Sequence, residues 1–505
     1  MGYARVCAVG LVGLAGHLVT VEADLSAGLP GLTLSGLPDT ALHEARDRVR
    51  AAMVNSGEAW PNRRIIVNLL PATLPKHGSS FDLAIALALL VGAGRLPQTA
   101  LDGVVVLGEL GLDGTVRAVR GVLPAMVAAQ REGVRRFIVP TANLAEAALV
   151  PDVTVHGTDA LHQVIRFIRD GEPLAAPAAP PPVPEAVGLD LADVAGQSRG
   201  RRALEVAAAG GHHLLLHGPP GAGKTMLAQR LPTILPPLTD AQALEVTAVR
   251  SIAGQLAPTA TLVRQPPFEA PHHSATAAAL VGGGSGLARP GALSLAHNGV
   301  LFLDEAPEFS SRVLDALRQP LEEGRISLAR SRGATVYPAR VQLVLAANPC
   351  PCANAAGECQ CSRVAKRRYL NRLSGPLLDR IDLRVTLFPI KPAQLFAEGD
   401  EIETSATVAQ RVAQARAVAA DRWAAEGWAT NSAVPGAALR RRPWRLPVAA
   451  TRDLMRALDR GALSARGHDR VLRAAWTLAD LAGRASPRAY EVNEAMQLRI
   501  GEGAS

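Results

Sequence analysis

Residues 213–231, HLLLHGPPGAGKTMLAQRL, carry the strongest chemical signal in the sequence. An apolar run meets a glycine-rich loop of the form G-x-x-x-x-G-K-[ST], and a predicted helix follows. Glycines let backbone N–H groups close around phosphate oxygens, the lysine neutralises phosphate charge, and the hydroxyl ligates Mg²⁺. The residues expected to bind the nucleotide are Gly218, Gly221, Ala222, Gly223, Lys224 and Thr225. A chance glycine-rich turn would not be expected to have this strand and helix around it.

A second segment supplies the acidic residues that such a site needs. Residues 299–309, GVLFLDEAPEF, contain an apolar run that predicts a buried strand ending at Asp304 and Glu305. We expect Asp304 to hold Mg²⁺ through water, together with Thr225, and Glu305 to polarise the attacking water. A strand followed by an acidic turn would give the same pattern without chemistry, but its place after a phosphate-binding loop favours the catalytic interpretation.

Three more polar residues could complete a hydrolytic site. Residues 341–349, VQLVLAANP, predict a strand ending at Asn348, whose amide could orient the water between Glu305 and the γ-phosphate. Arg380 is either a surface arginine or the residue that a neighbouring subunit offers to ATP. Arg466 stands at the start of a predicted helix and could reach the phosphates of its own subunit. Ordinary salt bridges are the alternative for both arginines.

Four of the five cysteines lie in residues 348–362, NPCPCANAAGECQCS. They are Cys350, Cys352, Cys359 and Cys361. ATP chemistry favours a cytosolic protein, where thiols stay reduced and disulfides are rare. Four thiolates this close can surround one tetrahedral Zn²⁺, although the C-x-C spacing is tighter than the usual C-x₂₋₄-C. The sequence therefore predicts structural zinc, with free thiols on a loop as the alternative.

Strands and helices must position these residues, and the chain is long enough to supply several domains. It has 505 residues, 48% of them hydrophobic and 19% charged, as in an ordinary globular protein. Residues 171–188 contain six prolines and predict a semi-rigid linker. The linker separates an α/β domain at 1–170 from a nucleotide-binding α/β core at 189–390. Residues 391–505 predict a helical region.

The part before the linker alternates between two kinds of element. Apolar, β-branched runs predict strands at 65–69, 104–108 and 136–139. Runs rich in Ala and Leu predict helices at 82–91 and 123–131.

Charge and hydropathy limit the possible partners. The formal net charge is +8, which favours a polyanionic partner, although an arginine-rich coding bias would give the same charge. No apolar run reaches the roughly 18–20 residues of a membrane span, so we expect no membrane partner. An apolar stretch after Arg5 resembles a signal peptide, but the alternation at 19–22, VTVE, favours a strand. Because the predicted chemistry uses ATP, we expect a cytoplasmic protein.

Residues 322–349 predict a hairpin, because an apolar strand, a basic turn and a returning strand follow one another. Arg330 and Arg332 lie near its tip. Such hairpins, arranged in a ring, would bind DNA phosphates without sequence preference, whereas a solvated tip is the alternative. His272 and His273 precede a GGGSG stretch and form a second candidate loop for contact with nucleic acid or a neighbouring subunit; no third ligand nearby supports a metal there.

The order of these motifs resembles that of AAA+ ATPases of the helix-2-insert and pre-sensor-1-hairpin group. That group includes magnesium-chelatase motor subunits and MCM-type helicases. The resemblance implies that Asn348 is sensor 1, Arg380 the arginine finger and Arg466 sensor 2, with Arg470 as the competing sensor-2 residue. It also implies a ring, usually a hexamer, with ATP between subunits. In MCM-type rings the hairpin projects into the pore, and Arg330 matches its basic residue.

Residues 267–309 and 28–57 are similar to the ComM/YifB family of magnesium-chelatase-like bacterial proteins. The similarity covers nearly the whole chain. ComM proteins resemble DNA branch-migration helicases that act in natural transformation and recombination. The resemblance implies ATP and Mg²⁺ as cofactors and single-stranded or branched DNA as a partner. Similar cysteines recur in ComM-like proteins, which supports a structural role for zinc.

Residues 68–89, NLLPATLPKHGSSFDLAIALAL, resemble the proteolytic domain of Lon and the similar domain of RadA. By that resemblance Ser80 occupies the place of the serine nucleophile, and Leu123 occupies the place of its lysine partner. A serine hydroxyl is a poor nucleophile without an adjacent base. The resemblance thus implies a ribosomal S5 domain 2-like fold without peptidase activity, whose role would be ring assembly or DNA contact.

The expected fold class is α/β, with a Lon-like N-terminal domain, an AAA+ core built on a doubly wound parallel sheet, and a helical C-terminal lid. The leading hypothesis is an ATP-driven, hexameric DNA translocase that promotes branch migration. One alternative is a magnesium-chelatase motor subunit that acts on a porphyrin-processing partner. Another is a scaffold or remodelling ring in which the ATPase only controls assembly. The response of ATP hydrolysis to branched or single-stranded DNA would separate them.

Overall fold

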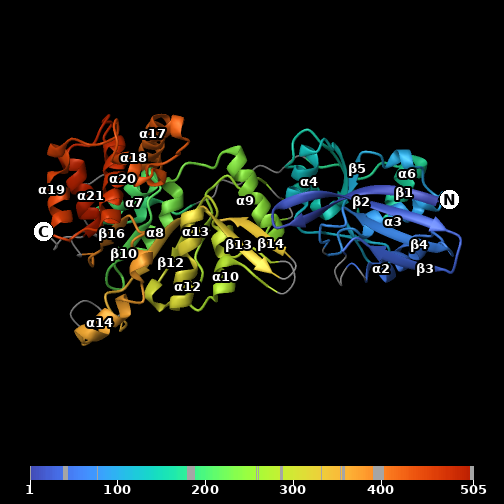
Figure 1. Cartoon of the computed structure of the whole chain (residues 1–505), viewed down its shortest axis with the longest axis horizontal. Coiled ribbons are helices and arrows are strands. Elements are labelled where there is room, and N and C mark those ends of the chain that lie inside the picture. The colour runs from blue at the N-terminus through green and yellow to red at the C-terminus, as the bar shows by residue number, and fades with distance from the viewer. Residues whose placement is uncertain are drawn as a thin grey trace.

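The computed structural model describes most of the chain (Figure 1). It covers residues 2–37, 42, 44–76, 78–178, 188–257, 259, 261–284, 288–330, 333–352, 354, 359–390 and 403–500. Half of the predicted linker, and the point at 391 where we expected the helical region to begin, lie outside the described residues. Figure 1 shows an elongated molecule, with the N-terminal part at one end, the nucleotide-binding core in the middle and the C-terminal helices at the other end.

A seven-stranded mixed sheet forms the framework of the N-terminal part, in the order β3-β4-β2-β1-β5-β8-β9. β1 and β2 are a long antiparallel pair, whereas β5, β8 and β9 run parallel. The strands are β1 (Gly2–Val12), β2 (Ala15–Ser26), β3 (Gly31–Ser35), β4 (Arg64–Leu70), β5 (Val104–Val106), β8 (Arg136–Pro140) and β9 (Thr154–Thr158). The predicted strands at 65–69, 104–108 and 136–139 fall on β4, β5 and β8.

Helices cover this sheet and complete its core. Helix α3 (Asp82–Gly92) is apolar on every side, so it is stable only inside a core, and Leu83–Leu90 are at most 1% exposed. The other helices here are α2 (Ala45–Asn55), α4 (Val122–Arg131), α5 (Leu144–Ala147) and α6 (Leu161–Asp170), and a small ladder joins β6 (Glu109–Leu110) to β7 (Val116–Arg117). Helices were predicted at the positions of α3 and α4.

A five-stranded parallel sheet forms the nucleotide-binding core, in the order β11-β12-β15-β10-β16. The strands are β11 (Phe268–Glu269), β12 (Val300–Leu303), β15 (Gln342–Ala347), β10 (Leu214–His217) and β16 (Leu383–Thr386). Because all five run in one direction, their carboxyl ends share one edge of the sheet and their amino ends share the opposite edge. This polarity decides which side chains can meet.

Both faces of the core sheet are buried, which explains its continuous apolar runs. In β12, Val300 and Phe302 join one hydrophobic cluster, and Leu301 and Leu303 join another on the opposite face. The helices of the core are α7 (Ser198–Gly210), α8 (Lys224–Ile234), α9 (Asp240–Ala253), α10 (Ala277–Val281), α11 (Ala292–Leu295), α12 (Ser311–Ala316), α13 (Arg318–Glu323), α14 (Arg363–Leu370) and α15 (Gly375–Leu378).

The described residues of the C-terminal region are helical and share a hydrophobic core with α7, α8 and the sheet. Trp423 lies at the centre of this region, with ring centroids 4.5 Å from Trp444 and 5.9 Å from Trp476. The helices are α17 (Ser405–Trp423), α18 (Gly436–Leu439), α19 (Val448–Asp459), α20 (Ala465–Leu481) and α21 (Ala489–Ile500). No helix among the described residues is long and apolar enough to cross a membrane.

Helix α9 and the strand β14 (Gly333–Pro338) of the core both contact the N-terminal part. The Ser251 hydroxyl of α9 donates a hydrogen bond to buried Glu146, which also accepts the backbone N–H of Leu123 at 2.8 Å. The β1–β2 turn lies against β14, and Gly13 there has φ 63°. A Cβ atom at Gly13 would come within 2.9 Å of the Val336 carbonyl oxygen, so the close approach requires glycine.

Candidate active site

The phosphate-binding loop lies at the carboxyl edge of the core sheet. β10 ends at His217, and helix α8 begins at Lys224, so the helix N-terminus points its free N–H groups at the loop. Gly221 and Gly223 have φ of 75° and 82°, which residues with a side chain rarely adopt. The predicted strand–loop–helix context of this motif is therefore present.

The Lys224 amine bridges the loop and the neighbouring strand. It donates hydrogen bonds to the backbone oxygens of Gly218 at 2.8 Å and Pro219 at 2.9 Å, and to the Asn348 side-chain oxygen at 2.9 Å. Burial lowers the pKa of Lys224, against the opposing effect of Asp304 and Glu305. The amine therefore contacts Asn348, the residue that we expected to orient the water, directly after the adjacent strand β15.

Two oxygen ligands suitable for Mg²⁺ lie next to the loop. The Thr225 hydroxyl donates to the Asp304 carboxylate at 2.7 Å, and the other carboxylate oxygen accepts the backbone N–H of Glu305 at 2.9 Å. Mg²⁺ prefers hard oxygen ligands, which the hydroxyl and the carboxylate supply. The donor set therefore fits the ion that the sequence predicts, with Thr225 and Asp304 as the residues that would hold it.

Glu305 has a backbone conformation and a partner that the sequence did not indicate. Its φ is 48°, uncommon for a residue with a side chain. Its carboxylate lies 3.5 Å from Nδ1 of His273, in the loop that we expected to contact DNA or a neighbouring subunit. The rings of His272 and His273 are tilted by 34° to each other, with centroids 4.0 Å apart. The pattern PHHSAT alone contains no signal for this contact.

Arg380 lies at the opposite edge of the sheet from the phosphate-binding loop. It follows α15 and precedes β16, so it stands at the amino end of that strand. The four residues of β16 and β10 pair in register, and each strand spans roughly 13 Å at about 3.3 Å per residue. The Arg380 guanidinium pairs with Glu322 and donates to the Pro376 carbonyl at 2.6 Å. It does not join the site of its own chain.

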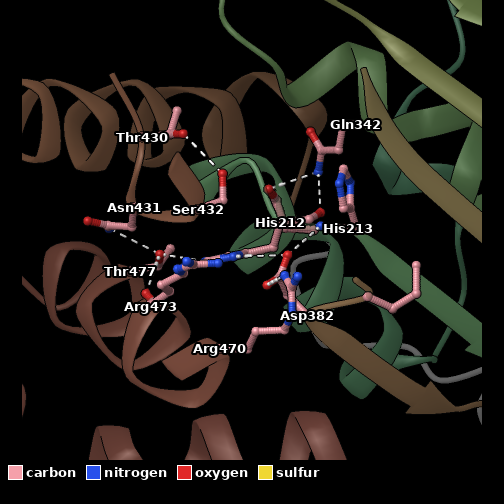
Figure 2. A network of polar contacts seen from close by, with 12 residues as sticks. His212, His213, Gln342, Asp382, Thr430, Asn431, Ser432, Arg470, Arg473 and Thr477 are labelled. Atoms are coloured by element: carbon pink, nitrogen blue, oxygen red, sulfur yellow. Dashed lines mark hydrogen bonds and ion pairs between the residues drawn. The ribbon is translucent and has the colours of Figure 1, made fainter. Parts of the chain in front are cut away.

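Arg470 belongs to a polar network at this same amino edge (Figure 2). Its guanidinium donates to the Asp382 carboxylate at 2.5 Å, and the backbone N–H of His213 donates to the same carboxylate at 3.0 Å. Burial alone would raise the pKa of Asp382, but the Arg470 guanidinium and the adjacent histidines hold it well below its ordinary value. Burial lowers the pKa of His213 to about 4.

Arg466 also lies at the amino edge. Its guanidinium is 3.7 Å from the Asp379 carboxylate, one residue before Arg380, and its side chain is 70% exposed. In this structure Arg466 does not reach the phosphate-binding loop of its own chain, because the length of the strands separates the two edges of the sheet. Sequence spacing could not show this, because it does not fix the edge of the sheet at which helix α20 meets the core.

The four clustered cysteines form a compact group directly after Asn348. All four sulfur atoms lie within 4.8 Å of one another, and Sγ of Cys350 is 3.1 Å from that of Cys352 and 3.3 Å from that of Cys359. These distances exclude disulfide bonds, because bonded sulfurs are about 2.05 Å apart. Sulfurs around one tetrahedral zinc at about 2.3 Å would be roughly 3.8 Å apart, so the group fits Zn²⁺.

The thiols of this group have different proton affinities. Burial raises the pKa of Cys350 to about 12, whereas the backbone amide of Cys361 lowers the pKa of Cys359 to about 6. Cys7, the fifth cysteine, lies apart in strand β1. Cys350, Cys352, Cys359 and Cys361, between Asn348 and Arg380, are thus a group of four thiols that could hold one metal ion.

The predicted hairpin is present before β15. β13 (Arg325–Arg330) pairs antiparallel with β14, and Arg330 stands opposite Gly333 at the end of the ladder. Arg332 lies outside the described residues, as does the side chain of Arg330. Among the described strands of the core, this hairpin is the one that lies against the β1–β2 turn.

The Lon-like segment holds a buried lysine close to the predicted serine in sequence. The Lys76 amine donates to the backbone oxygens of Leu69 at 2.8 Å and of Pro71, and burial lowers the pKa of Lys76. The hydroxyl of Ser79, next to Ser80, donates to Glu109. Leu123 is fully buried in the core around α4, at the place where Lon-like proteases would have their lysine.

Three family models match the chain. Magnesium chelatase, subunit ChlI, covers residues 190–395; subunit ChlI of Mg-chelatase covers 21–143; and the C-terminal model of the ChlI subunit covers 402–499. Together with the parallel sheet and the phosphate-binding loop, these matches define a magnesium-chelatase-like AAA+ protein. That class implies ATP and Mg²⁺ as cofactors.

Similar whole proteins show which family within this class the chain belongs to. Rv2897c of Mycobacterium tuberculosis is 54% identical over 500 residues, which cover 99% of each chain. YifB of Escherichia coli is 47% identical over 400 residues, 79% of this chain and 78% of that protein. The competence protein ComM of Haemophilus influenzae is 43% identical over 491 residues, 96% of this chain and 94% of that protein. The chain belongs to the ComM/YifB family.

A weaker match bears on the N-terminal fold. Lon protease 1 of Herpetosiphon aurantiacus is 30% identical over 179 residues, 33% of this chain and 22% of that protein. The expected fold class is therefore confirmed: a Lon-like α/β part, a AAA+ core on a parallel sheet, and a helical C-terminal region.

Proposed function

We propose that this protein is an ATP-driven, ring-forming DNA translocase that promotes the migration of branched DNA. The observation that carries the proposal is the division of the ATP-handling residues between two edges of one sheet. The loop, Asp304, Glu305 and Asn348 lie at the carboxyl edge, and Arg380, Arg466 and Arg470 lie at the amino edge. A complete site therefore needs two copies of the chain.

The carboxyl edge supplies the chemistry of phosphate binding and hydrolysis. Lys224 neutralises the β- and γ-phosphates. Its amine now donates to the carbonyl oxygens of Gly218 and Pro219, and it would donate to phosphate oxygens instead when ATP binds. Thr225 and Asp304 would hold Mg²⁺, which would neutralise phosphate charge when bound. Glu305 polarises the attacking water, and Asn348 positions that water against the γ-phosphate. Phosphoryl transfer depends mainly on this positioning and electrostatic stabilisation.

The amino edge supplies positive charge to a neighbouring subunit. Arg380 is the finger that stabilises charge on the transferred phosphoryl group, and its pairing with Glu322 holds it until a neighbour docks. Arg466 is better placed than Arg470 to act beside it, because its side chain is exposed whereas Arg470 neutralises buried Asp382. Such an arrangement closes on itself in a ring, for which we propose six subunits.

The hairpin β13–β14 supplies the contact with DNA. Arg330 and Arg332, near its tip, contact phosphates, so binding is independent of base sequence. The hairpin leads directly into β15, and Asn348 follows that strand. In this proposal, a shift of Asn348 when ATP is hydrolysed moves β15 and, with it, the hairpin. The similarity to a competence protein suggests that the DNA substrates arise in natural transformation and recombination.

The zinc proposal is part of this account. We propose that the four-cysteine group holds one structural Zn²⁺, which fixes the excursion between Asn348 and Arg380. A closed four-thiolate site leaves no open position for substrate, so its role is to hold the segment in one conformation. The protein is proposed to act in the cytoplasm, where such thiols stay reduced.

The family matches also favour a second candidate function. All three family models carry the name of the ChlI subunit of magnesium chelatase, so a motor that acts on a porphyrin-processing partner is the competing proposal. ATP turnover measured with a Holliday junction, with single-stranded DNA and without DNA separates the two. The translocase requires turnover to rise with DNA, most with the junction. Unchanged turnover in all three samples would favour the chelatase-type motor or an ATP-gated scaffold.

A further inference from the structure

Helix α14 and its flanking residues form a strongly basic segment that neither the ATP site nor the hairpin uses. Residues 359–378 contain no Asp or Glu. Five basic residues lie within them: Arg363, Lys366, Arg367, Arg368 and Arg372. So much charge of one sign in one short segment repels itself unless a counter-charge is nearby.

Among the described residues, only one of these five has an acidic partner. Arg372 pairs with Glu308 at 2.9 Å and donates to the Pro307 carbonyl at 3.1 Å. The other four make no ion pair or side-chain hydrogen bond with any described residue. Arg363, Arg367 and Arg368 are exposed, and Lys366 is half-buried. Within the part of the chain that the structure describes, nothing neutralises their charge, so a partner can bind it.

The helix presents three of these charges on one side. Arg363, Lys366 and Arg367 are spaced i, i+3 and i+4, so they are neighbours on one helical face. Tyr369, at 4% exposure, and Leu373, also at 4%, anchor the segment to the body of the protein. We call Arg363, Lys366 and Arg367 the basic face of α14. Its orientation is fixed because the anchoring side chains are buried.

The helix is held where a large ligand can reach it. Figure 1 shows α14 at the margin of the molecule, beyond the sheet and far from the N-terminal part. The cysteine group lies directly before the helix, and the Ser362 hydroxyl accepts the backbone N–H of Ala365 at 3.2 Å as its N-terminal cap. These two features fix the start of the helix, so little conformational freedom is lost when a partner binds.

We infer that the basic face of α14 binds the phosphate backbone of DNA, as a contact site separate from the hairpin. This inference rests on the proposed function for the identity of the polyanion. Arginine guanidinium groups bind phosphate oxygens in a bidentate manner without reading bases.

An anionic membrane and an acidic protein fit the helix less well. Membrane-surface helices insert an apolar face, but Tyr369 and Leu373 are already buried in the protein. Stable protein interfaces have an apolar centre, and Val364, 71% exposed, is the one large exposed apolar side chain of α14. A surface with charge and almost no exposed apolar area suits a phosphate backbone.

The position of α14 connects this contact to hydrolysis. Arg372, just after the helix, holds Glu308 in the short turn that follows Glu305. The Ser374 hydroxyl, two residues further on, bonds to Asp315 of α12. DNA on the basic face therefore acts on a segment that is attached to the water-polarising residue and leads to Arg380.

The test compares two triple variants by fluorescence anisotropy of a labelled DNA duplex over a range of salt concentrations. The first, R363Q/K366Q/R367Q, removes the basic face. The matched control, R441Q/R445Q/R452Q, removes the same charge from exposed arginines that make no described side-chain pair. The thermal unfolding midpoint and the zinc content show whether each variant is folded.

We expect the first variant to bind about tenfold or more weakly at low salt. The slope of log K against log salt should fall by up to about 2.7, because each lost phosphate contact removes about 0.9. The control should keep the wild-type slope. If the first variant, folded and with its zinc, keeps the wild-type affinity and slope, or if both variants lose binding equally, the inference is overturned while the translocase proposal stands. A wild-type protein that binds no DNA at low salt with ATP would overturn both.

Discussion

At the scale of single residues, Lys224 and Glu305 have separable roles. K224A removes the amine that Gly218, Pro219 and Asn348 surround, so nucleotide binding should be lost. E305Q keeps the shape of the side chain but not the charge that polarises water, so ATP should bind without turnover. Equilibrium binding of labelled ATP and phosphate release, measured on the same preparations, check both outcomes. Normal turnover by E305Q would remove Glu305 from the mechanism.

A second prediction at this scale concerns the buried pair of Arg470 and Asp382. R470M leaves the Asp382 carboxylate buried without its guanidinium partner, which should cost about 3–5 kcal/mol of unfolding free energy near neutral pH. Because the folded-state pKa of Asp382 lies well below its ordinary value, the stability it supplies is present above about pH 4 and is lost as the pH falls further. The deficit of R470M should therefore shrink below about pH 4.

Denaturant unfolding of R470M at neutral and acid pH measures this effect. R466M is the matched control on the same helix, since its exposed guanidinium lies 3.7 Å from Asp379 and should change the unfolding free energy by no more than about 0.5 kcal/mol. Equal stability of the two variants at neutral pH would show that Arg470 does not stabilise Asp382.

The residues at the carboxyl edge were predictable because their motifs end strands. Asp304, Asn348 and the loop each follow an apolar run, and parallel strands bring their carboxyl ends together. The arginines were not predictable in position, because Arg380 and Arg466 precede or begin elements whose packing depends on the whole fold. The contact of His273 with Glu305 comes from an irregular loop, for which periodicity gives no direction.

At the scale of elements, the cysteine group should act as one unit. C350S/C361S removes two of four ligands, so the protein should lose its zinc, and its thermal stability and ATPase activity should fall together. C7S is the matched control, because Cys7 lies in β1, apart from the group. Metal analysis of wild-type protein purified without chelator should give one zinc per chain. If the wild-type protein, purified without chelator, is folded and hydrolyses ATP but contains no zinc, the zinc proposal is wrong.

Strands and helices with strong patterns were predictable from sequence, and their ends were less so. The run at 104–108 predicted a strand, but β5 ends at Val106. The Leu107 N–H still bonds to the Ile138 carbonyl of the neighbouring strand β8, whereas the Gly108 N–H bonds to the Ser80 carbonyl, outside the sheet. The hairpin was predictable because its strands alternate around a basic turn. The basic face of α14 was visible as composition, but only the fold shows that its charges have no described partner.

At the scale of the whole molecule, the two edges of the sheet predict that activity is shared between subunits. R380A should lower turnover by roughly 10³–10⁵, as the loss of an arginine finger does. In a mixture of R380A and E305Q subunits, some interfaces combine an intact Glu305 with an intact Arg380 from the neighbour. Phosphate release by the mixture should therefore exceed that of either variant alone. A mixture with no recovered activity would weaken the shared-site assignment.

The most direct test of the translocase account is ATP-dependent movement of a four-way junction. A labelled Holliday junction with homologous arms is incubated with wild-type protein and ATP, and the conversion to duplex products is followed over time. The account predicts conversion with ATP, none with E305Q protein, and steep loss of conversion as salt rises, because the contacts are to phosphate. Wild-type protein that hydrolyses ATP but leaves the junction unmoved at low salt would contradict it.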